Sequence, residues 1–473
     1  MSLTLLVSMV LAFAFSISIA VAIGGSAMLG IALFDPDKLV LAPKEMFTAI
    51  DKFPLAAVPF FILAGNLMET GGISRRLVDF AKSLVGGVQG GLPMTCVLTC
   101  MIFAAVSGSS VATTFAIGAI LIPALIKHGY PTNWAAALQA TSAELGVIIP
   151  PSIPMILYGV AAEVSIGEMF IAGVGPGLLI GGALMVFVYL WCKWKGWGKA
   201  DGDGRLPLAT AASDLAFVAG FGVVVWLAHS LTEDPTVHLL VPLAYLLLFL
   251  AVPRLRAIAT GHAALALLMP VIILGGIYGG IFTPTEAAAV AVFYALLVGM
   301  GVYREIGPAD LVRILRKSVV SASVIMFIIA NAGLFAYLIT RAGVPTAIGE
   351  WLKDVLQSPL LFLLGVNLAL FLIGMFIETS ASIIVLAPIL APVAMFFGID
   401  PIHFGIVMVV NLALGMITPP FGVNLFAACT VARISLDRVI ASLLPFVLVV
   451  LGCLMVITFV PALTLSLRDL VYK

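Results

Sequence analysis

Long apolar runs fill most of this chain, and short polar segments separate them. Runs long enough to cross a membrane, which takes roughly 20 residues each, lie at about 3–33, 169–192, 263–282, 286–303, 319–340 and 439–465. Because helices satisfy their own backbone hydrogen bonds in lipid, these runs predict an all-α polytopic membrane protein. The first run lacks the basic start and the cleavage site of a signal peptide, so we interpret it as a retained membrane segment.

The composition supports this interpretation. Hydrophobic residues make up 62% of the chain and charged residues 10%, with a mean hydropathy of +1.22, which leaves too few charges to cover a soluble globule. The formal net charge of zero argues against a nucleic acid or another polyanion as a partner. The five cysteines form no CxxC motif and the five histidines show no metal-binding spacing, which disfavours a disulfide framework and a metalloenzyme.

Two windows of the chain share the positions that interrupt membrane helices. Residues 104–176 repeat at 373–445 with a constant offset of 269. The matched pairs are Pro123 with Pro392, Gly129 with Gly398, Gly146 with Gly415, Pro150 with Pro419, Pro151 with Pro420 and Pro176 with Pro445. Hydrophobic units broken by Gly and Pro at the same depth are typical of secondary transporters, whose ligand lies where broken helices of the two halves meet. We therefore predict two inverted repeats.

Lysine and arginine gather in three loops, near residues 193–205, 254–256 and 304–317. By the positive-inside rule these loops face the cytoplasm. Between the first two loops, a segment at about 206–255 contains two apolar runs that leave one side and return to it. We expect this extra hairpin to be peripheral. The side of the N-terminus stays open, because that end carries almost no charge.

Each repeat begins with a short amphipathic segment. One helical face of the first carries Ile73, Leu77, Phe80 and Leu84, and one face of the second carries Ile348, Trp351, Leu352, Val355 and Leu356. Charged residues lie opposite in both, which predicts helices along the membrane surface. They are either ordinary loop helices or arms that join a fixed part to a moving part, and their matched positions favour arms.

A small polar cluster then interrupts the apolar sequence of each repeat. In the first copy, Ser107, Gly108, Ser109 and Ser110 separate limbs at 92–106 and 111–126, and in the second, Glu378, Thr379 and Ser380 separate limbs at 359–377 and 381–397. Each limb is short for a full span, so we interpret both units as re-entrant hairpins with the cluster at the tip. Non-helical backbone at membrane depth requires surrounding protein or a water-filled cavity. A polar turn at the membrane surface is the alternative.

A second interruption follows each hairpin, at 149–154 and at 418–424, and each contains a Pro-Pro pair. Proline donates no backbone hydrogen bond, so the pair leaves carbonyl oxygens free, and hard cations prefer such ligands. Hydroxyls of Ser109, Ser110 or Thr379 combined with these carbonyls suit Na⁺, while half-helix N-termini present N–H groups to an anion. A simple proline kink is the alternative.

Three acids lie in or beside apolar runs. Glu286 closes the sequence Thr-Pro-Thr-Glu, which predicts a helix capping box. Glu378 lies at a hairpin tip, where an ionisable group is costly in the membrane. It either handles an ion or a proton, or it accepts hydrogen bonds from the N–H groups of its own hairpin. Glu144, which lies just before Gly146, stays ambiguous.

Several separated stretches carry a family resemblance, namely VSGSSVATTFAIGAILIPALIKHGY, IIPPSIPMILYG, GGIYGGIFTPTEAAAVAVFYA and GMITPPFGVNLF. They resemble the large membrane subunit of tripartite ATP-independent periplasmic (TRAP) transporters, over about residues 50–200 and 260–465. The resemblance implies an elevator-type, Na⁺-driven importer of organic acids, such as C4-dicarboxylates, sialic acid or other sugar acids, in the bacterial inner membrane. It also implies a small four-helix membrane subunit and a periplasmic substrate-binding protein as partners. The segment at about 206–255 departs from the family pattern.

Carried over position by position, the resemblance implies two Na⁺ sites, with substrate between the two tips. One site would use Ser107, Gly108, Ser109, Ser110, Pro150 and Ser152, and the other Glu378, Thr379, Ser380, Thr418, Pro419 and Gly422. Substrate contacts would come from Ser109, Ser152, Thr379, Asn424 and Arg433. Arg433 equally suits a helix end, so N–H dipoles, hydroxyls and Na⁺ are expected to meet the substrate carboxylate.

The resemblance also divides the chain into a fixed and a moving part. Scaffold helices would occupy 1–70, 169–340 and 437–473, arm helices 71–91 and 341–358, and transport repeats 92–168 and 359–436. A stand-alone Na⁺/dicarboxylate symporter, which needs no binding protein, is the alternative within transport. A membrane enzyme would need a concentrated set of acid, base or metal ligands, which the sequence lacks, and no organic cofactor is expected.

Overall fold

Helices account for every regular element of the chain that the structure describes. In this computed structural model the described residues are 2–15, 17–198, 208–231, 241–242, 244–246, 263–356, 358–420 and 422–472. Within them, eight helices are long and apolar enough to cross a membrane, or nine if one bent pair of shorter helices is taken as a single span. The prediction of an all-α polytopic membrane protein is confirmed.

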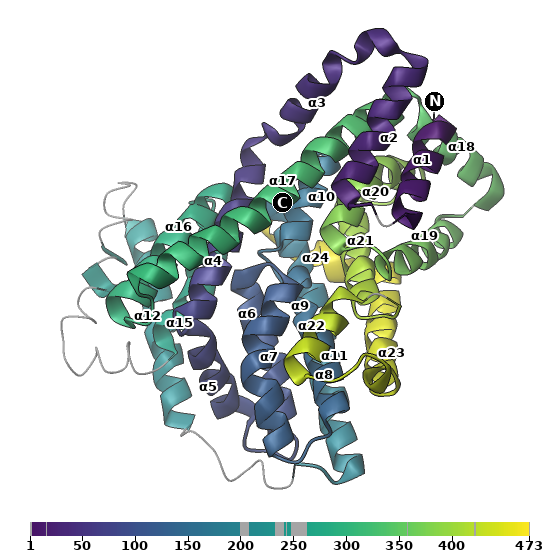
Figure 1. Ribbon diagram of the computed structural model, residues 1–473. Coiled ribbons are helices and arrows are strands. Elements are labelled where there is room, and N and C mark those ends of the chain that lie inside the picture. The colour runs from purple at the N-terminus through teal and green to yellow at the C-terminus, as the bar shows by residue number, and fades with distance from the viewer. Residues whose placement is uncertain are drawn as a thin grey trace.

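The N-terminal and central parts of the chain pack together around one long helix, α17 (Pro308–Arg341). The other members are α1 (Ser2–Ala14), α2 (Ile19–Phe34), α3 (Leu41–Ile50), α4 (Ala57–Thr70), α12 (Leu208–Leu231), α15 (Ala264–Tyr278) and α16 (Pro284–Leu296), with the turns η1 (Pro36–Lys38), η2 (Phe53–Ala56) and η4 (Leu297–Val302). Figure 1 shows α17 running diagonally across the molecule beside α3 and α4, both of which it contacts. Proline at its first position and an Asp310 side chain that accepts from Gly307 N–H fix its start.

Part of the predicted extra hairpin at about 206–255, chiefly residues 232–240 and 247–255, lies outside the described residues. Its first limb is α12, which packs against α15 and against the amphipathic helix α5 (Ile73–Val85). The backbone N–H of Ala263 donates to the buried Asp214 carboxylate of α12 at 3.3 Å. The described limb is therefore tied to the helices beside it.

The first predicted repeat contains α5 and six further helices. They are α6 (Gly91–Ser107), α7 (Ser110–Lys127), α8 (Thr132–Ala143), α9 (Leu145–Ile148), α10 (Ile153–Ala161) and α11 (Ile166–Lys195). Serine hydroxyls at positions 109, 152 and 165 accept backbone N–H groups at the starts of α7, α10 and α11, which satisfies donors that a helix leaves unpaired. The chain bends by 42° between residues 132–148 and 153–161.

The second predicted repeat has the same order of helices. These are α18 (Val344–Leu356), α19 (Pro359–Gly374), α20 (Thr379–Phe396), α21 (Pro401–Met416), α22 (Val423–Ala432), α23 (Asp437–Phe459) and the terminal α24 (Ala462–Tyr472). The sequence offset of 269 carries α7 onto α20 at both ends, since 110 + 269 = 379 and 127 + 269 = 396. Both Pro-Pro bonds, at 150–151 and 419–420, are cis. Inverted orientation of the two units stays a prediction.

Both amphipathic segments are helices, and the side chains of Leu352, Val355 and Leu356 in the second lie outside the described part of the chain. In α5, Ile73, Leu77 and Phe80 are buried against neighbouring helices, whereas Leu84 is exposed. In α18, Trp351 is exposed although it shares the predicted face. In a membrane protein such a side chain can lie against lipid. The role of these helices as arms stays a prediction.

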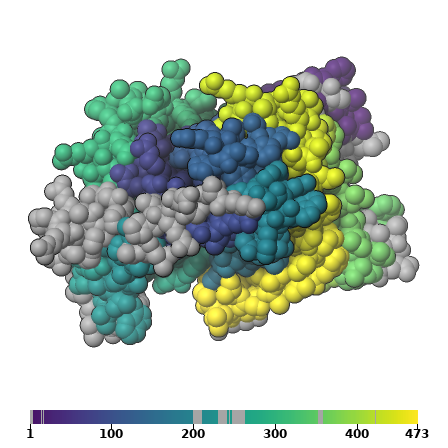
Figure 2. Space-filling view, turned by 90° about the horizontal axis from the view of Figure 1, so that it is seen from below, coloured from purple at the N-terminus to yellow at the C-terminus, as the bar shows by residue number. Residues whose placement is uncertain are grey.

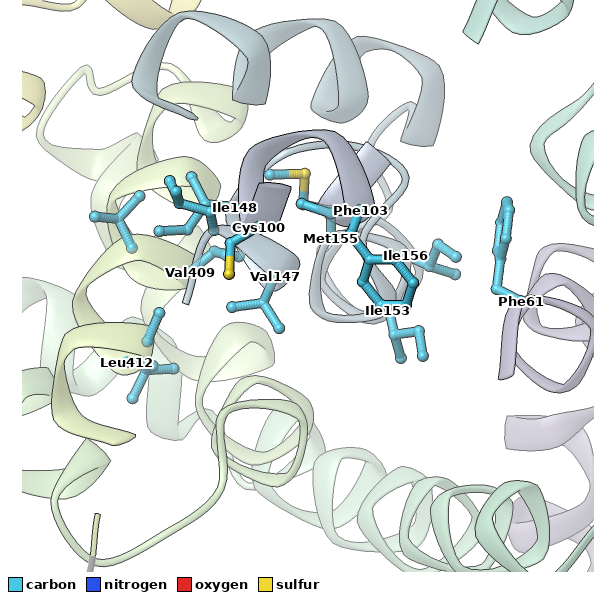
Figure 3. Close-up of a cluster of buried hydrophobic side chains, with 14 of the residues drawn as sticks. Phe61, Cys100, Phe103, Val147, Ile148, Ile153, Met155, Ile156, Val409 and Leu412 are labelled. Carbon is cyan, nitrogen blue, oxygen red and sulfur yellow. The ribbon is translucent and has the colours of Figure 1, made fainter. Parts of the chain in front are cut away.

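The broken helices of the first repeat meet α21 of the second in a dense apolar core. Figure 3 shows Cys100 and Phe103 from α6, Val147 and Ile148 from α9, Ile153, Met155 and Ile156 from α10, Val409 and Leu412 from α21, and Phe61 from α4. Small residues permit close approach between these helices, as at Gly405 of α21, where a side chain would meet the Tyr158 ring. Figure 2 shows the C-terminal residues in yellow beside the first repeat in blue, which agrees with contacts between α8 and α23. This core holds the two interruptions in place.

Candidate functional site

The first polar cluster is a tight turn between α6 and α7. Gly108 takes the left-handed conformation that favours glycine, with φ of 62°, and Ser109 begins α7 by accepting the N–H of Ala112 at 3.4 Å. Ser107 and Ser110 are buried. The tip therefore lies inside protein, as a re-entrant hairpin requires, and not as a turn exposed at the molecular surface.

This tip touches the first Pro-Pro interruption directly. The N–H of Ile153 donates to the carbonyl oxygen of Gly108 at 3.3 Å. Any Cβ on Gly108 would lie 3.0 Å from the carbonyl oxygen of Pro151. Ser152, besides capping α10, donates to the carbonyl oxygen of Val147 at 2.6 Å. The interruption and the tip thus form one oxygen-rich unit.

Thr113 completes this unit, and the sequence analysis missed it. Its hydroxyl donates to the carbonyl oxygen of Ser109 at 2.8 Å and lies 3.0 Å from the hydroxyl of Ser107. A side chain on Gly146 would come within 2.7 Å of Thr113 Oγ1, so the absence of that side chain allows the approach. A usable signal existed, because the offset of 269 carries Thr113 onto Ser382, another hydroxyl residue.

The second tip is held by its own acid. Glu378 caps α20, with one carboxylate oxygen accepting the N–H of Ala381 at 3.1 Å and the other accepting the Ser380 hydroxyl at 2.8 Å. These bonds favour the capping interpretation of Glu378. The Thr379 hydroxyl, which is buried, donates to the sulfur of Met416 at 2.9 Å. This contact joins the tip to the end of α21.

The second Pro-Pro interruption lies beside this tip. Thr418 donates its hydroxyl to the carbonyl oxygen of Leu414 at 2.8 Å. Gly422 begins α22 with φ of 27°, and a Cβ there would lie 3.2 Å from the carbonyl oxygen of Met416. Carbonyl oxygens of the interruption therefore crowd the start of α22, as proline-rich breaks in broken helices predict.

One hydrogen bond joins the second interruption to the start of α9, which directly precedes the first interruption. Asn424, in the first turn of α22, donates from Nδ2 to the Oε1 atom of Glu144 at 2.5 Å. Both side chains are buried, and Glu144 lies between α8 and α9. A predicted substrate residue thus contacts the acid that the sequence left ambiguous.

Arg433 lies away from this group. It ends α22 in the left-handed conformation and is exposed. At 1.5 Å of rise per residue, nine residues separate it from Asn424 by about 14 Å. Its position is that of a helix end, the second of the two interpretations open for it.

The other singled-out residues have structural partners. Glu286 forms the predicted capping box with Thr283, each accepting a backbone N–H from the other. Cys96 donates to the amide oxygen of Gln139 at 3.1 Å, and that amide donates to Cys100 at 3.6 Å. The two thiols therefore pack around a buried glutamine.

A cavity of about 640 Å³ is lined by residues of α3, α10, α17 and α20. Its wall includes the charged residues Glu45, Lys52, Glu163 and Arg341, together with Ile384 and Pro388 of α20. None of the five predicted substrate residues lines it. The cavity instead follows the boundary between the predicted scaffold and the predicted transport helices.

The fold agrees with comparisons to known proteins. The family described as "Tripartite ATP-independent periplasmic transporter, DctM component" matches residues 4–463. The chain is 40% identical to the C4-dicarboxylate TRAP transporter large permease protein DctM of Pseudomonas aeruginosa, over 95% of this chain and 94% of that protein. It is 34% identical to the sialic acid TRAP transporter large permease protein SiaM of Vibrio cholerae, over 94% and 93%.

A solved structure shares the fold at much lower identity. The Alcanivorax borkumensis YdaH transporter superposes with a TM-score of 0.62 at 16% identity, covering 92% of this chain and 91% of that one. Its likeness is one of fold. The family match and the two permeases together show that this chain belongs to the DctM family of TRAP transporters and is a multi-pass membrane permease.

Proposed function

We propose that this chain is the transport subunit of a Na⁺-driven, binding-protein-dependent importer of an organic acid. The relatives named above are permeases for C4-dicarboxylates and for sialic acid, and both substrates are carboxylates. The observations that carry the proposal are the hydrogen bond from the first Pro-Pro interruption to the Gly108 carbonyl, and the bond from Thr379 to Met416, which lies two residues before the second interruption. These are neutral oxygen ligands, which suit a dehydrated monovalent cation.

At the first tip, Na⁺ would be held by the Ser107 and Thr113 hydroxyls and by carbonyl oxygens of the turn and the interruption. These groups already lie together, since Ser107 Oγ, Thr113 Oγ1 and the Ser109 carbonyl are within 3.4 Å of one another. No basic side chain pairs with any of them among the described ion pairs. A cation would therefore meet oxygen ligands there without a competing basic side chain among those ion pairs.

At the second tip, Thr379 and the carbonyl oxygens crowded near Gly422 would hold another Na⁺. Thr379 now bonds a thioether, a weak acceptor that an ion can replace at low cost. Bound Na⁺ at both tips would supply positive charge beside the substrate carboxylate. N–H groups at the starts of α7 and α20 would add to this attraction for the carboxylate, since helix N-termini attract anions.

An elevator movement would carry the tips past the scaffold. The boundary cavity lies along α10 and α20 on one side and α3 and α17 on the other. Helix α17 is 34 residues long, about 51 Å, so its ends lie on opposite sides of the bilayer. Because Arg313, Arg316 and Lys317 mark its cytoplasmic start, Arg341 and the cavity belong to the periplasmic side. An organic acid delivered by a periplasmic protein would enter there.

Two experiments test the proposal. Purified protein in detergent is heated with NaCl, KCl or choline chloride at equal ionic strength, and unfolding is followed by tryptophan fluorescence. We expect Na⁺ alone to raise the midpoint temperature. At a Na⁺ concentration one hundred times its dissociation constant, binding at one site adds about 2.7 kcal/mol to the free energy of unfolding. In proteoliposomes, uptake should require both the small membrane subunit and the binding protein. Equal midpoints in all three salts would contradict the Na⁺ sites.

A further inference from the structure

Glu144 and Asn424 form a side-chain hydrogen bond that joins the start of α9 to the second interruption. Their side chains belong to different halves of the chain, 280 residues apart. The exposed fraction is 2% for Glu144 and 0% for Asn424. A glutamate in such a place is costly if charged, because water and a cationic partner are both missing.

The charged surroundings of Glu144 strengthen this point. The helices that pack against α8 and α9 are α6, α7, α10, α11, α21, α22 and α23. In the described part of the chain, none of them brings a basic side chain to Glu144, and the thiols of α6 contact Gln139 instead. Glu378 of the second tip is another acid, and its charge interacts unfavourably with a charged Glu144. Its negative charge disfavours a second one nearby.

The pair also leaves two buried oxygens without a hydrogen bond. Among the described residues, neither Oε2 of Glu144 nor Oδ1 of Asn424 has a partner. Buried polar atoms are nearly always bonded, so both call for an explanation. Both atoms are acceptors, and they belong to the two side-chain groups that the Nδ2 to Oε1 bond already joins. One hydrogen placed between them would satisfy both.

We propose that Glu144 is a proton-binding site and that its neutral carboxylic acid forms a two-bond pair with the Asn424 carboxamide. The acid O–H donates from Oε2 to Asn424 Oδ1, while Asn424 Nδ2 donates to Oε1. The pair locks α9 of the first repeat to α22 of the second and lets the transport helices move without a charge at this position. It is separate from the Na⁺ ligands at the tips and does not depend on the identity of the substrate.

The proposal makes a directional prediction for stability against pH. The folded protein holds a proton that the unfolded chain releases in mildly acidic solution, so stability falls as pH rises. The full-length protein in detergent is unfolded by heat across a pH series. The midpoint temperature of unfolding of the wild-type protein should fall as the pH becomes alkaline. Glu144→Gln should keep a high midpoint and lose that dependence, since a Gln amide donates to Asn424 Oδ1 without a titrating proton. Glu350→Gln, which changes an exposed acid, should retain the wild-type profile.

An exchange of partners separates pairing from general damage. Asn424→Asp alone places two acids together and should unfold at the lowest temperature, most of all at alkaline pH. The double variant Glu144→Gln with Asn424→Asp restores one acid and one amide, and should recover both the midpoint and its pH dependence.

Infrared spectra provide a second readout, in which wild type shows a protonated-carboxyl C=O band that Glu144→Gln lacks. Three results would overturn the proposal in favour of a charged, cation-binding carboxylate. They are a wild-type pH profile in Glu144→Gln, a wild-type infrared spectrum without the protonated-carboxyl band, and a raised Na⁺ requirement in Glu144→Gln. If Na⁺ failed to stabilise the wild-type protein against heat, that result would count against the proposed function alone.

Discussion

Gly415 at the end of α21 lies directly against Gly374 of the second hairpin. A Cβ on Gly415 would lie 2.8 Å from the carbonyl oxygen of Gly374, so the two segments approach this closely because neither has a side chain. Gly415→Ala should destabilise the protein by about 1–3 kcal/mol through overpacking and should reduce uptake, measured by thermal unfolding and in proteoliposomes. Gly452→Ala, where a Cβ meets nothing within 4 Å, should preserve both. Wild-type stability of Gly415→Ala would contradict the tight contact.

Thr113 should be a Na⁺ ligand although it lies one turn inside α7. Thr113→Val keeps the shape and removes the hydroxyl that lies near Ser107 and the Ser109 carbonyl. We expect the Na⁺ concentration for half-maximal uptake to rise about tenfold, which corresponds to about 1.4 kcal/mol. The matched control is Thr114→Val, because the neighbouring hydroxyl bonds only the Ser110 carbonyl. An equal shift in both variants would mean that the effect is structural.

Much of this arrangement could be predicted from residue types. Gly and Pro commonly interrupt helices in an apolar run, so both tips and both interruptions could be located in the sequence. The spacing of Thr283 and Glu286 alone predicts the capping box. Thr113 is harder to single out, because a threonine inside an apolar run commonly bonds the carbonyl four residues back, and the mark that it carries in the sequence is its match to Ser382 under the offset of 269.

Long-range partners could not be predicted in the same way. The bond from Asn424 to Glu144 spans 280 residues and depends on how the two halves pack. Proximity in sequence also gave Arg433 a predicted role beside the substrate or at a helix end, and the structure places it at the far end of α22 from Asn424. Distance along a helix grows by 1.5 Å per residue, which a motif read along the chain does not reveal.

The carboxylate of Glu378 should be a helix cap and not a proton carrier. Glu378→Gln retains an oxygen that can accept the Ala381 N–H, so uptake should remain Na⁺-dependent with a modest loss. Removing the acceptor in Glu378→Ala should cost roughly 1 kcal/mol of stability, as for other N-caps. Uptake assays with opposed Na⁺ and pH gradients distinguish the roles. A collapse of transport in Glu378→Gln with intact folding would assign proton coupling to this acid.

Arg341 should help to attract the organic acid into the boundary cavity. Its guanidinium donates to the Tyr337 hydroxyl at 2.8 Å, and both residues line the cavity wall. Arg341→Gln should raise KM several-fold with little change in kcat, and the difference should shrink at high ionic strength, because salt screens exposed charges. Tyr337→Phe, which removes the bond but keeps the charge, should have the smaller effect. A fall in kcat without a change in KM would place Arg341 outside the entry path.

The coupling ion is the central claim, and a gradient experiment tests it most directly. The complete transporter, with its small subunit and loaded binding protein, is reconstituted into liposomes with an inward Na⁺ gradient, an inward proton gradient or neither. The neutral oxygen sets at Ser107, Thr113 and Thr379 predict accumulation that follows the Na⁺ gradient and stops in Na⁺-free buffer. Full accumulation in Na⁺-free buffer, driven by the pH gradient, would contradict the assignment of Na⁺ to both tips.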